Sequence, residues 1–210
     1  MRETYASYHS PVLPIADIQA RLSVHDPLRF SVRPDTRQAA VAVVLREHDG
    51  DTEVLFIQRA VKEGDPWSGD MAFPGGHREP ADANLAAAAI RETAEEIGLV
   101  IETSDMIGEL SQQRPVRAAG RIDMLVAPYV FAIEGDPEFE MSHEVADVVW
   151  TRLAPMHAGV NRTTEPKSIG GQPIPFPGYR LGERHFVWGL TYRMVQSLFE
   201  VLDPAFEPSD

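Results

Sequence analysis

The stretch that decides the fold of this chain runs from Ala72 to Leu99 and reads AFPGGHREPADANLAAAAIRETAEEIGL. It starts with Pro74-Gly75-Gly76, a loop signal whose two glycines let the backbone approach a ligand closely. Pro80 and Asp82 are helix-start residues, and strong helix formers follow them. Gly98 is a typical residue just past the end of a helix. We therefore predict a loop followed by a helix that begins near Asp82 and ends before Gly98.

The predicted helix has an apolar face and an acidic face. The apolar face comprises Ala86, Ala89, Ile90, Thr93 and Ile97. Glu92, Glu95 and Glu96 fall together on roughly the opposite face, where each pair of like charges costs about 0.2–0.5 kcal/mol. They also lie at the negative end of the helix dipole. A solvated polar face is the ordinary interpretation, but the glycine loop and the spacing of Arg91 favour a face that binds a divalent cation.

The run from Arg91 to Leu99, RETAEEIGL, resembles the signature of the Nudix hydrolase family, Arg-Glu-apolar-x-Glu-Glu-x-Gly-apolar. Three features depart from the common form. The spacer between Gly76 and Arg91 is one residue longer, its acid is Asp82 rather than glutamate, and Thr93 occupies an apolar position. The longer spacer with an aspartate is similar to the coenzyme A pyrophosphatase-like branch of the family. That branch carries a preceding motif that ends in His-x-Gly-Gln, whereas this chain reads Pro66-Trp67-Ser68-Gly69-Asp70.

The resemblance implies an α+β fold, a Nudix-type α/β/α sandwich with a mixed β-sheet between helices. Apolar and alternating runs predict strands at Arg37–Arg46, Glu53–Arg59, Met106–Arg114, Ile122–Ile133 and Glu144–Thr151. An amphipathic run predicts a closing helix at Gly189–Leu202. Asn161–Leu181 is rich in proline and glycine without periodicity, so we interpret it as a covering loop or a mobile lid. We expect residues 1–34 to form a helical segment that packs on a Nudix domain at 35–210.

The resemblance also implies hydrolysis of a pyrophosphate bond with Mg²⁺ or Mn²⁺. A diphosphate resists attack because its oxygens are negative, so catalysis needs charge neutralisation and a positioned water. Mg²⁺ prefers oxygen ligands and bridges carboxylates to phosphates. By the family pattern the metal ligands are the carboxylates of Glu92, Glu95 and Glu96 and the carbonyl of Gly75.

The catalytic residues implied by the same resemblance are Glu95, Glu92, Arg91 and Glu144. One of the helix glutamates or an acid of the loop before the last strand deprotonates the attacking water. Glu144, Glu140 and Glu138 are the candidate acids of that loop. Arg91 orients a glutamate through a charge-assisted hydrogen bond.

Three residues are candidates for substrate binding. Arg59 ends a strand, and in Nudix enzymes an arginine in this place often contacts substrate phosphate; otherwise it is a surface cation. Trp67 is either a hydrophobic plug or a flat surface for a base or a pantetheine arm. Arg114 starts a cluster of three arginines that suits a polyphosphate or else forms a solvated basic loop.

The expected substrate is a nucleoside diphosphate linked to another moiety, with coenzyme A or a derivative as one candidate. ADP-ribose or a dinucleotide is the alternative, because the histidine and glutamine of the coenzyme A motif are absent. A Nudix domain that only binds a nucleotide and regulates a partner is an alternative of another class. It predicts broken metal ligands, whereas all three glutamates are intact.

Composition limits the partners. With 19 basic and 32 acidic residues, the 210-residue chain has a net charge of −13, which argues against nucleic-acid binding through basic patches. The chain has no cysteine, so it offers no disulfide or thiol chemistry. No apolar run reaches transmembrane length and Met1–Ser10 lacks a signal-peptide pattern, so we expect no membrane partner and a cytoplasmic location. Family habit and the apolar face of Ile15–Leu22 suggest a homodimer.

Overall fold

Two long strands, β1 (Arg37–His48) and β8 (Met124–Ile133), run parallel in the centre of a mixed seven-stranded sheet. The computed structural model describes residues 13–64, 67–117, 120–121 and 123–208. Some residues that our sequence analysis interprets lie outside the described residues. They are the first twelve residues, Pro66, and Ile122, where the fourth strand was predicted to begin.

The sheet has the order β3-β2-β1-β8-β5, with β4 paired to β1 and β9 paired to β2. The bounds of the further strands are β2 (Asp51–Arg59), β3 (Met71–Ala72), β4 (Gly75–His77), β5 (Met106–Glu109) and β9 (Val145–Arg152). All their pairings are antiparallel, and the parallel β1–β8 pair makes the sheet mixed. The predicted α+β sandwich is therefore confirmed.

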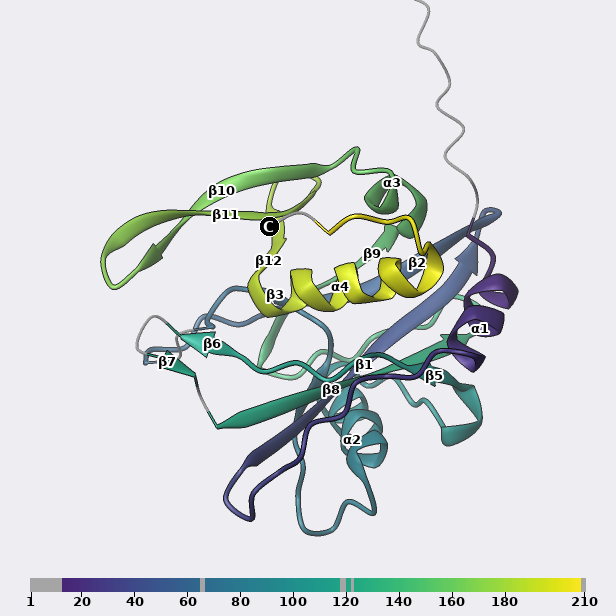
Figure 1. Ribbon diagram of the computed structural model, residues 1–210, viewed down its shortest axis with the longest axis horizontal. Helices are drawn as coiled ribbons and strands as arrows, with labels where there is room; N and C mark the ends of the chain where they lie inside the picture. Colours follow the sequence, from purple (N-terminus) through teal and green to yellow (C-terminus); the bar gives the residue numbers. More distant parts are fainter. Residues whose placement is uncertain (1–12, 65–66, 118–119, 122, 209–210) are drawn as a thin grey trace, which may run out of the picture.

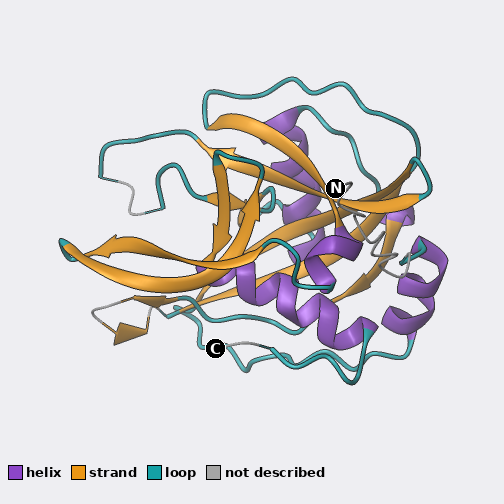
Figure 2. Cartoon of the chain, turned by 90° about the horizontal axis from the view of Figure 1, so that it is seen from above, coloured by secondary structure: helices purple, strands orange, loops and turns teal. Residues whose placement is uncertain are grey.

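Helices cover both faces of the sheet (Figures 1 and 2). On one face lies α2 (Leu85–Ile97), and on the other lie α1 (Ile15–Ser23) and α4 (Gly189–Leu202). Successive β1 residues alternate between two apolar clusters, one that includes α4 and one that includes α2. A strand buried on both faces must be apolar at every position, which explains the uninterrupted run AAVAVVL.

The Asn161–Leu181 segment is not a covering loop, and that prediction is wrong. It forms a β-hairpin of β10 (Arg162–Ile169) and β11 (Gln172–Leu181), which continues to β12 (His185–Trp188). Gly170 and Gly171 have φ of 59° and 80°, as a two-residue hairpin turn requires. The hairpin extends away from the sandwich in Figure 1.

Most predicted elements are confirmed, with shifted ends. The closing helix is confirmed as α4, and strands β1, β2, β8 and β9 match their predictions within a few residues. The predicted strand Met106–Arg114 stops at Glu109, after which Gln113 makes only an isolated bridge to Val126. The short strands β3, β4 and β12 were not predicted, and neither were η1 (Thr103–Asp105), β6 (Val116–Arg117), β7 (Gly120–Arg121) and α3 (Leu153–His157).

Candidate active site

Gly75 and Gly76 are part of the sheet, although we predicted a loop for Pro74-Gly75-Gly76. Gly75–His77 forms β4, which pairs with Ala39–Val41 of β1. Gly75 has φ of 152°, and a Cβ built on it would lie 2.3 Å from the Ala40 carbonyl oxygen. A Cβ on Gly76 would lie 2.4 Å from the carboxyl group of Glu92. Gly75 therefore requires glycine, because its Cβ would meet backbone atoms, whereas a Cβ on Gly76 would push aside the Glu92 carboxylate that lies against its backbone.

The helix α2 begins at Leu85, three residues later than predicted, because Asp82 has another role. Asn84 is the N-cap, and its side chain accepts a hydrogen bond of 2.8 Å from the Ala87 amide. Asp82 is buried and accepts hydrogen bonds from the guanidinium of Arg91, at 3.1 and 3.0 Å. The hydrogen bond from Arg91 lowers the pKa of Asp82. Asp82 therefore anchors Arg91 rather than starting the helix.

Arg91 joins the loop before α2 to two of the three helix glutamates. Its guanidinium donates to Glu92 Oε1 at 3.0 Å, to Glu95 Oε2 at 3.1 Å and to the His77 carbonyl at 3.0 Å. Charge-assisted hydrogen bonds of this kind fix orientation as well as supplying energy. Arg91 thus holds the carboxylates of Glu92 and Glu95.

Glu96 is buried, although we had placed it with Glu92 and Glu95 on an exposed acidic face. It is 4% exposed, whereas the side chain of Glu95 is 59% exposed. The expectation failed because β4 lies across this part of α2, and the Gly75 amide donates a 2.9 Å hydrogen bond to Glu96 Oε2. Burial raises the pKa of Glu96 to about 7. Burial also raises the pKa of Glu92, and the hydrogen bond from Arg91 partly opposes that shift.

Arg59 and Glu144 approach these acids from the sheet. The charge of Arg59 lowers the pKa of Glu96 and the charge of Glu144 raises it, so both groups lie within electrostatic reach. The two residues are also neighbours, because the amide of Ala60 donates to the Glu144 carbonyl at 2.8 Å. The charges of Arg59 and Glu144 therefore act on the α2 glutamates, and the roles assigned to both residues stay predictions.

The other loop acids take a structural position. The Glu140 amide donates to the Ile97 carbonyl at 3.0 Å, and its backbone packs against Gly98. This contact closes the C-terminal end of α2. Glu138 is exposed in the same loop.

Arg114 and Trp67 have different surroundings. Arg114 lies 3.5 Å from Asp123, stacks over Phe30 at 4.9 Å and donates to the Ser31 carbonyl at 3.3 Å. These contacts tie it to the N-terminal segment, away from the helix acids. Trp67 lies in the loop that follows Arg59 and is 41% exposed. The roles assigned to both residues stay predictions.

The donor set suits a hard divalent cation, and Nudix hydrolases generally use one. Three carboxylates and a backbone carbonyl are the oxygen ligands that Mg²⁺ and Mn²⁺ prefer. The buried carboxyl of Glu96, with its raised pKa, is a site where a positive charge would be stabilising. Within the described part of the chain, no three acidic or histidine side chains converge as a finished metal site. Arg91 holds Glu92 and Glu95, and Gly75 holds Glu96, so binding would require these side chains to turn.

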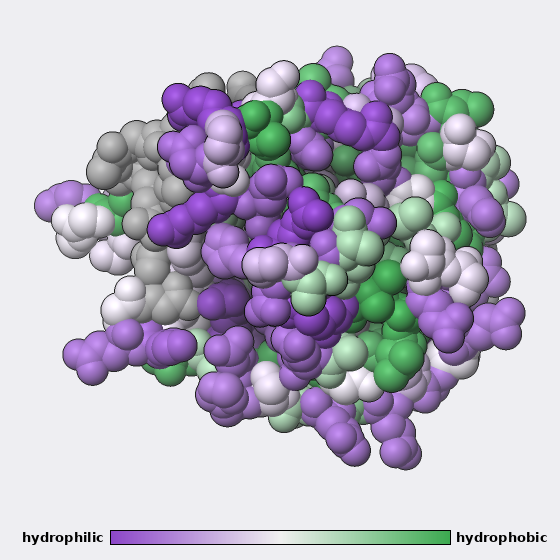
Figure 3. Space-filling model, turned by 90° about the horizontal axis from the view of Figure 1, so that it is seen from below, coloured by the Kyte–Doolittle hydropathy of each residue, from purple (hydrophilic) through white to green (hydrophobic). Residues whose placement is uncertain are grey.

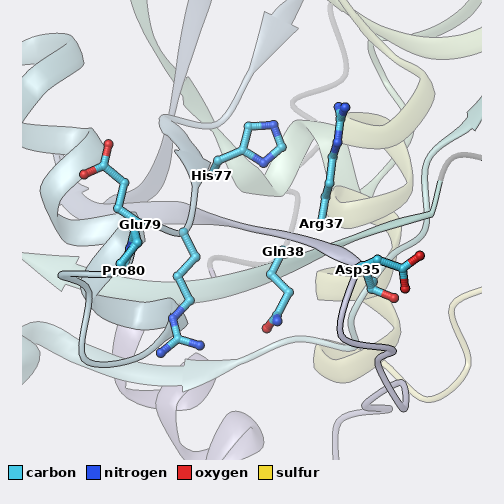
Figure 4. A pocket seen from close by; sticks show the side chains of 8 residues that line it. Asp35, Arg37, Gln38, His77, Glu79 and Pro80 are labelled. Carbon is cyan, nitrogen blue, oxygen red and sulfur yellow. The ribbon is translucent and has the colours of Figure 1, made fainter.

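A polar groove of about 750 Å³ adjoins the site along β4 and the start of β1 (Figure 4). Its lining comprises Asp35, Thr36, Arg37, Gln38, His77, Arg78, Glu79 and Pro80. The groove is next to the acids because the His77 carbonyl accepts from Arg91. The α2 side of the molecule is largely hydrophilic (Figure 3).

The family follows from this geometry and from comparison with known proteins. The model of the NUDIX domain matches residues 36–167, which contain β1, β4, α2 and the hairpin's first strand in part. The chain therefore belongs to the Nudix family, as the signature around Arg91 predicted, and it is an enzyme of the pyrophosphohydrolase class.

Two relatives match most of this chain. The chain is 31% identical over 191 residues to the mitochondrial coenzyme A diphosphatase NUDT8 of Homo sapiens, covering 88% of this chain and 76% of that protein. It is 33% identical over 193 residues to the uncharacterized Nudix hydrolase NudL of Citrobacter koseri, covering 84% and 90%. The predicted similarity to the coenzyme A pyrophosphatase-like branch is therefore confirmed.

The fold has a solved counterpart. A MutT/nudix family protein from Enterococcus faecalis shares it with a TM-score of 0.53 and 16% identity, over 88% of this chain and 68% of that one. No helix in the described residues is long and apolar enough to span a membrane. The cytoplasmic location stays a prediction.

Sequence reasoning missed two contacts that organise the site. It did not connect Asp82 with Arg91, although both were singled out, because the contact depends on how the loop turns back over α2. It also gave no role to Asp70, whose carboxylate accepts a hydrogen bond from Trp188. The second contact joins residues 118 positions apart, so no local pattern could have indicated it.

Proposed function

We propose that this protein hydrolyses the pyrophosphate bond of a nucleoside diphosphate linked to another moiety, with coenzyme A or a derivative as the first candidate substrate. The observation that carries the reaction type is the buried Glu96 beneath the Gly75 amide, beside Glu92 and within reach of Arg59. A carboxyl group is buried this way at a cost, which a cation bound with the substrate would offset. The similarity to NUDT8 supports coenzyme A.

The residues of the chain divide the work as follows. Glu92, Glu95, Glu96 and the Gly75 carbonyl would hold Mg²⁺ or Mn²⁺, which supplies charge neutralisation for the pyrophosphate and activation of water. Arg91, anchored by Asp82, would orient one of these glutamates through a charge-assisted hydrogen bond. Glu95 or Glu144, both exposed to solvent, would accept a proton from the attacking water. Arg59 would bind a phosphate oxygen of the substrate.

ADP-ribose or a dinucleotide is a second candidate substrate because of the segment before β3. There Trp67 and Asp70 replace the histidine and glutamine of the coenzyme A motif. Asp70 accepts a hydrogen bond from Trp188. The position of the motif's glutamine is therefore taken here by a carboxylate that is bonded to an indole. The reaction at the phosphorus would be the same, and only the group beyond the pyrophosphate would change.

The test is a turnover assay on coenzyme A, ADP-ribose, NADH, diadenosine polyphosphates and nucleoside triphosphates, with Mg²⁺ and with Mn²⁺. Glu95→Gln on the best substrate should lower kcat by about 10²–10⁴, the scale of a positioned acid–base group. The melting temperature should hardly change, because Glu95 is largely exposed and loses only a surface ion pair.

Glu200→Gln is the matched control, since Glu200 is an exposed glutamate on α4. It should leave both activity and melting temperature unchanged. If Glu95→Gln turned over the substrate at the wild-type rate, Glu95 would be a surface residue without a role in the reaction. If the wild type turned over none of the substrates, the proposed function itself would fail.

A further inference from the structure

A hydrogen bond between Asp70 and Trp188 joins the segment beside Arg59 to the start of α4. The indole Nε1 of Trp188 donates to Asp70 Oδ1 at 2.8 Å. Next to it, the buried hydroxyl of Thr191 donates to the Met71 carbonyl at 3.1 Å. Two consecutive residues of one segment are therefore held by two side chains from the first turn of α4 and the residue before it. We call this pair of contacts the β3 clasp.

The hairpin fixes Trp188 from the other side. The Phe176 ring packs against the indole with centroids 4.9 Å apart and planes at 60°. The Lys167 ammonium lies 5.0 Å from the indole ring centroid. Edge-to-face packing and a cation over a ring are both attractive. The indole is thus held in one orientation, with its N–H directed at Asp70.

Asp70 in turn flanks the candidate phosphate ligand. Its carbonyl accepts from the Arg59 amide at 3.0 Å, and its own amide donates to the Trp67 carbonyl at 3.2 Å. One residue earlier, the Gly69 carbonyl accepts from Gln58 Nε2 at 3.3 Å. The clasp therefore reaches both Arg59 and Trp67 through a single residue.

The charge of Asp70 calls for an explanation. A carboxylate one hydrogen bond away from Arg59 would repel a polyanionic substrate if it faced the site. The donor N–H of Trp188 gives that carboxylate a fixed partner and directs it towards α4. A charged acceptor also makes this hydrogen bond stronger than a neutral pair would.

We propose that Asp70 is a positioning residue, held by Trp188, which fixes Arg59 for a phosphate oxygen of the substrate and Trp67 for the part of the substrate beyond it. This inference rests on the proposed function. The reacting phosphorus depends on the α2 acids, which the clasp does not touch. We expect Arg59 and Trp67 to bind the ground state and the transition state equally, and the loss of such uniform binding raises KM and leaves kcat unchanged.

Three variants test the clasp. Trp188→Phe keeps a ring for Phe176 and Lys167 but removes the donor, and Asp70→Ala removes the acceptor. Each should raise KM about tenfold, as expected for a lost hydrogen bond to a charged group, with kcat within about twofold. Asp70→Asn keeps an acceptor oxygen and should retain a KM at or below that of the wild type.

Trp150→Phe is the matched control for the indole. Within the described residues, the buried Nε1 of Trp150 has no hydrogen-bond partner, and its ring packs on Phe139 and Arg46 instead. Its KM should equal that of the wild type. If Trp188→Phe and Asp70→Ala both lowered the melting temperature but left KM unchanged, the clasp would be a structural contact without a role in substrate binding.

Hydrogen exchange measured by mass spectrometry separates the clasp from the activity. Peptides that contain Arg59 and Asp70 should exchange faster in Asp70→Ala and Trp188→Phe, and at the wild-type rate in Asp70→Asn. If Trp188→Phe failed to fold, Asp70→Ala would decide alone. A wild type without turnover would remove the proposed function, whereas unchanged exchange in Asp70→Ala would overturn the clasp in either case.

Discussion

Glu95 and Glu96 are adjacent in the sequence and have opposite surroundings. Glu95 is largely exposed and bonded to Arg91, whereas Glu96 is buried under β4 and accepts a backbone N–H. The raised pKa of Glu96 follows from this burial. One repeated residue type therefore supplies one solvated carboxylate and one desolvated carboxylate within a single helical turn.

The pKa of Glu96 predicts how the stability of the protein depends on pH without divalent cations. The folded pKa of about 7 lies above the ordinary value of 4.5 for a glutamate, so folding favours the protonated form. Stability should therefore be highest below pH 4.5 as far as this group is concerned, and it should fall as pH rises from 4.5 to about 7. Unfolding in chelator should show this loss, on the order of a few kcal/mol.

Glu96→Gln should remove that part of the pH dependence, because an amide does not titrate. Above pH 7 the variant should unfold at a higher denaturant concentration than the wild type in chelator. With Mg²⁺ present the order should reverse, since the wild type gains cation binding. Equal pH profiles for the two proteins would show that Glu96 does not titrate between pH 4.5 and 7.

At this scale the sequence predicted which residues meet but not how they are buried. A contact between Arg91 and one glutamate was predicted, and the structure has Arg91 bonded to two, Glu92 and Glu95. The burial of Glu96 comes from β4, whose position depends on pairing with β1. Helical periodicity alone cannot contain that information, because another element covers the helix.

The helix α2 is the element that carries the candidate acids, and a residue at each end sets its limits. Asn84 caps the first turn, and Gly98 ends the helix in the left-handed conformation with φ of 70°. The stop at Gly98 was predicted from the sequence. The start was not, because Asp82 and Asn84 are both good capping residues and only tertiary contacts with Arg91 distinguish them.

Asn84→Ala should therefore destabilise the protein by about 0.5–2 kcal/mol, since the Ala87 amide loses its acceptor. Asn84→Asp keeps an acceptor and should cost much less. Chemical unfolding of the three proteins in one buffer measures the difference. A wild-type midpoint for Asn84→Ala would mean that water replaces the cap without loss.

The prediction from the sequence and the structure differ most at the hairpin β10–β11, which we had predicted as a loop. Prolines at 166, 173, 175 and 177 suggested an irregular loop. In the structure, Pro166 and Pro175 face each other in the register. The strand β12 pairs only with Gly178–Leu181 of β11, so both strands have a free edge where the prolines lie, and proline is tolerated at such an edge. The Gly170-Gly171 pair was the available signal, since two such glycines between extended runs indicate a hairpin.

At the scale of the whole molecule, one of the two arguments for the predicted homodimer does not hold. The apolar residues Ile18 and Leu22 of α1 are buried in the cluster that contains α4 of the same chain. That face is therefore not available to a second copy. The homodimer stays a prediction, and light scattering at micromolar concentration decides it: a dimer mass is expected, and a clean monomer mass would end the idea.

The net charge of −13 also acts on the molecule as a whole. Like charges repel one another across the surface and destabilise the compact state, and salt screens them over a Debye length of about 10 Å at 0.1 M. In chelator, the melting temperature should therefore rise by a few degrees between about 10 mM and 300 mM KCl, a gain on the order of 1 kcal/mol. Tetramethylammonium chloride should act equally, because general screening needs no specific binding.

A few millimolar Mg²⁺ should raise the melting temperature beyond KCl of the same ionic strength, and Glu96→Gln should lose only that excess. A flat response to KCl would show that opposite charges already balance locally.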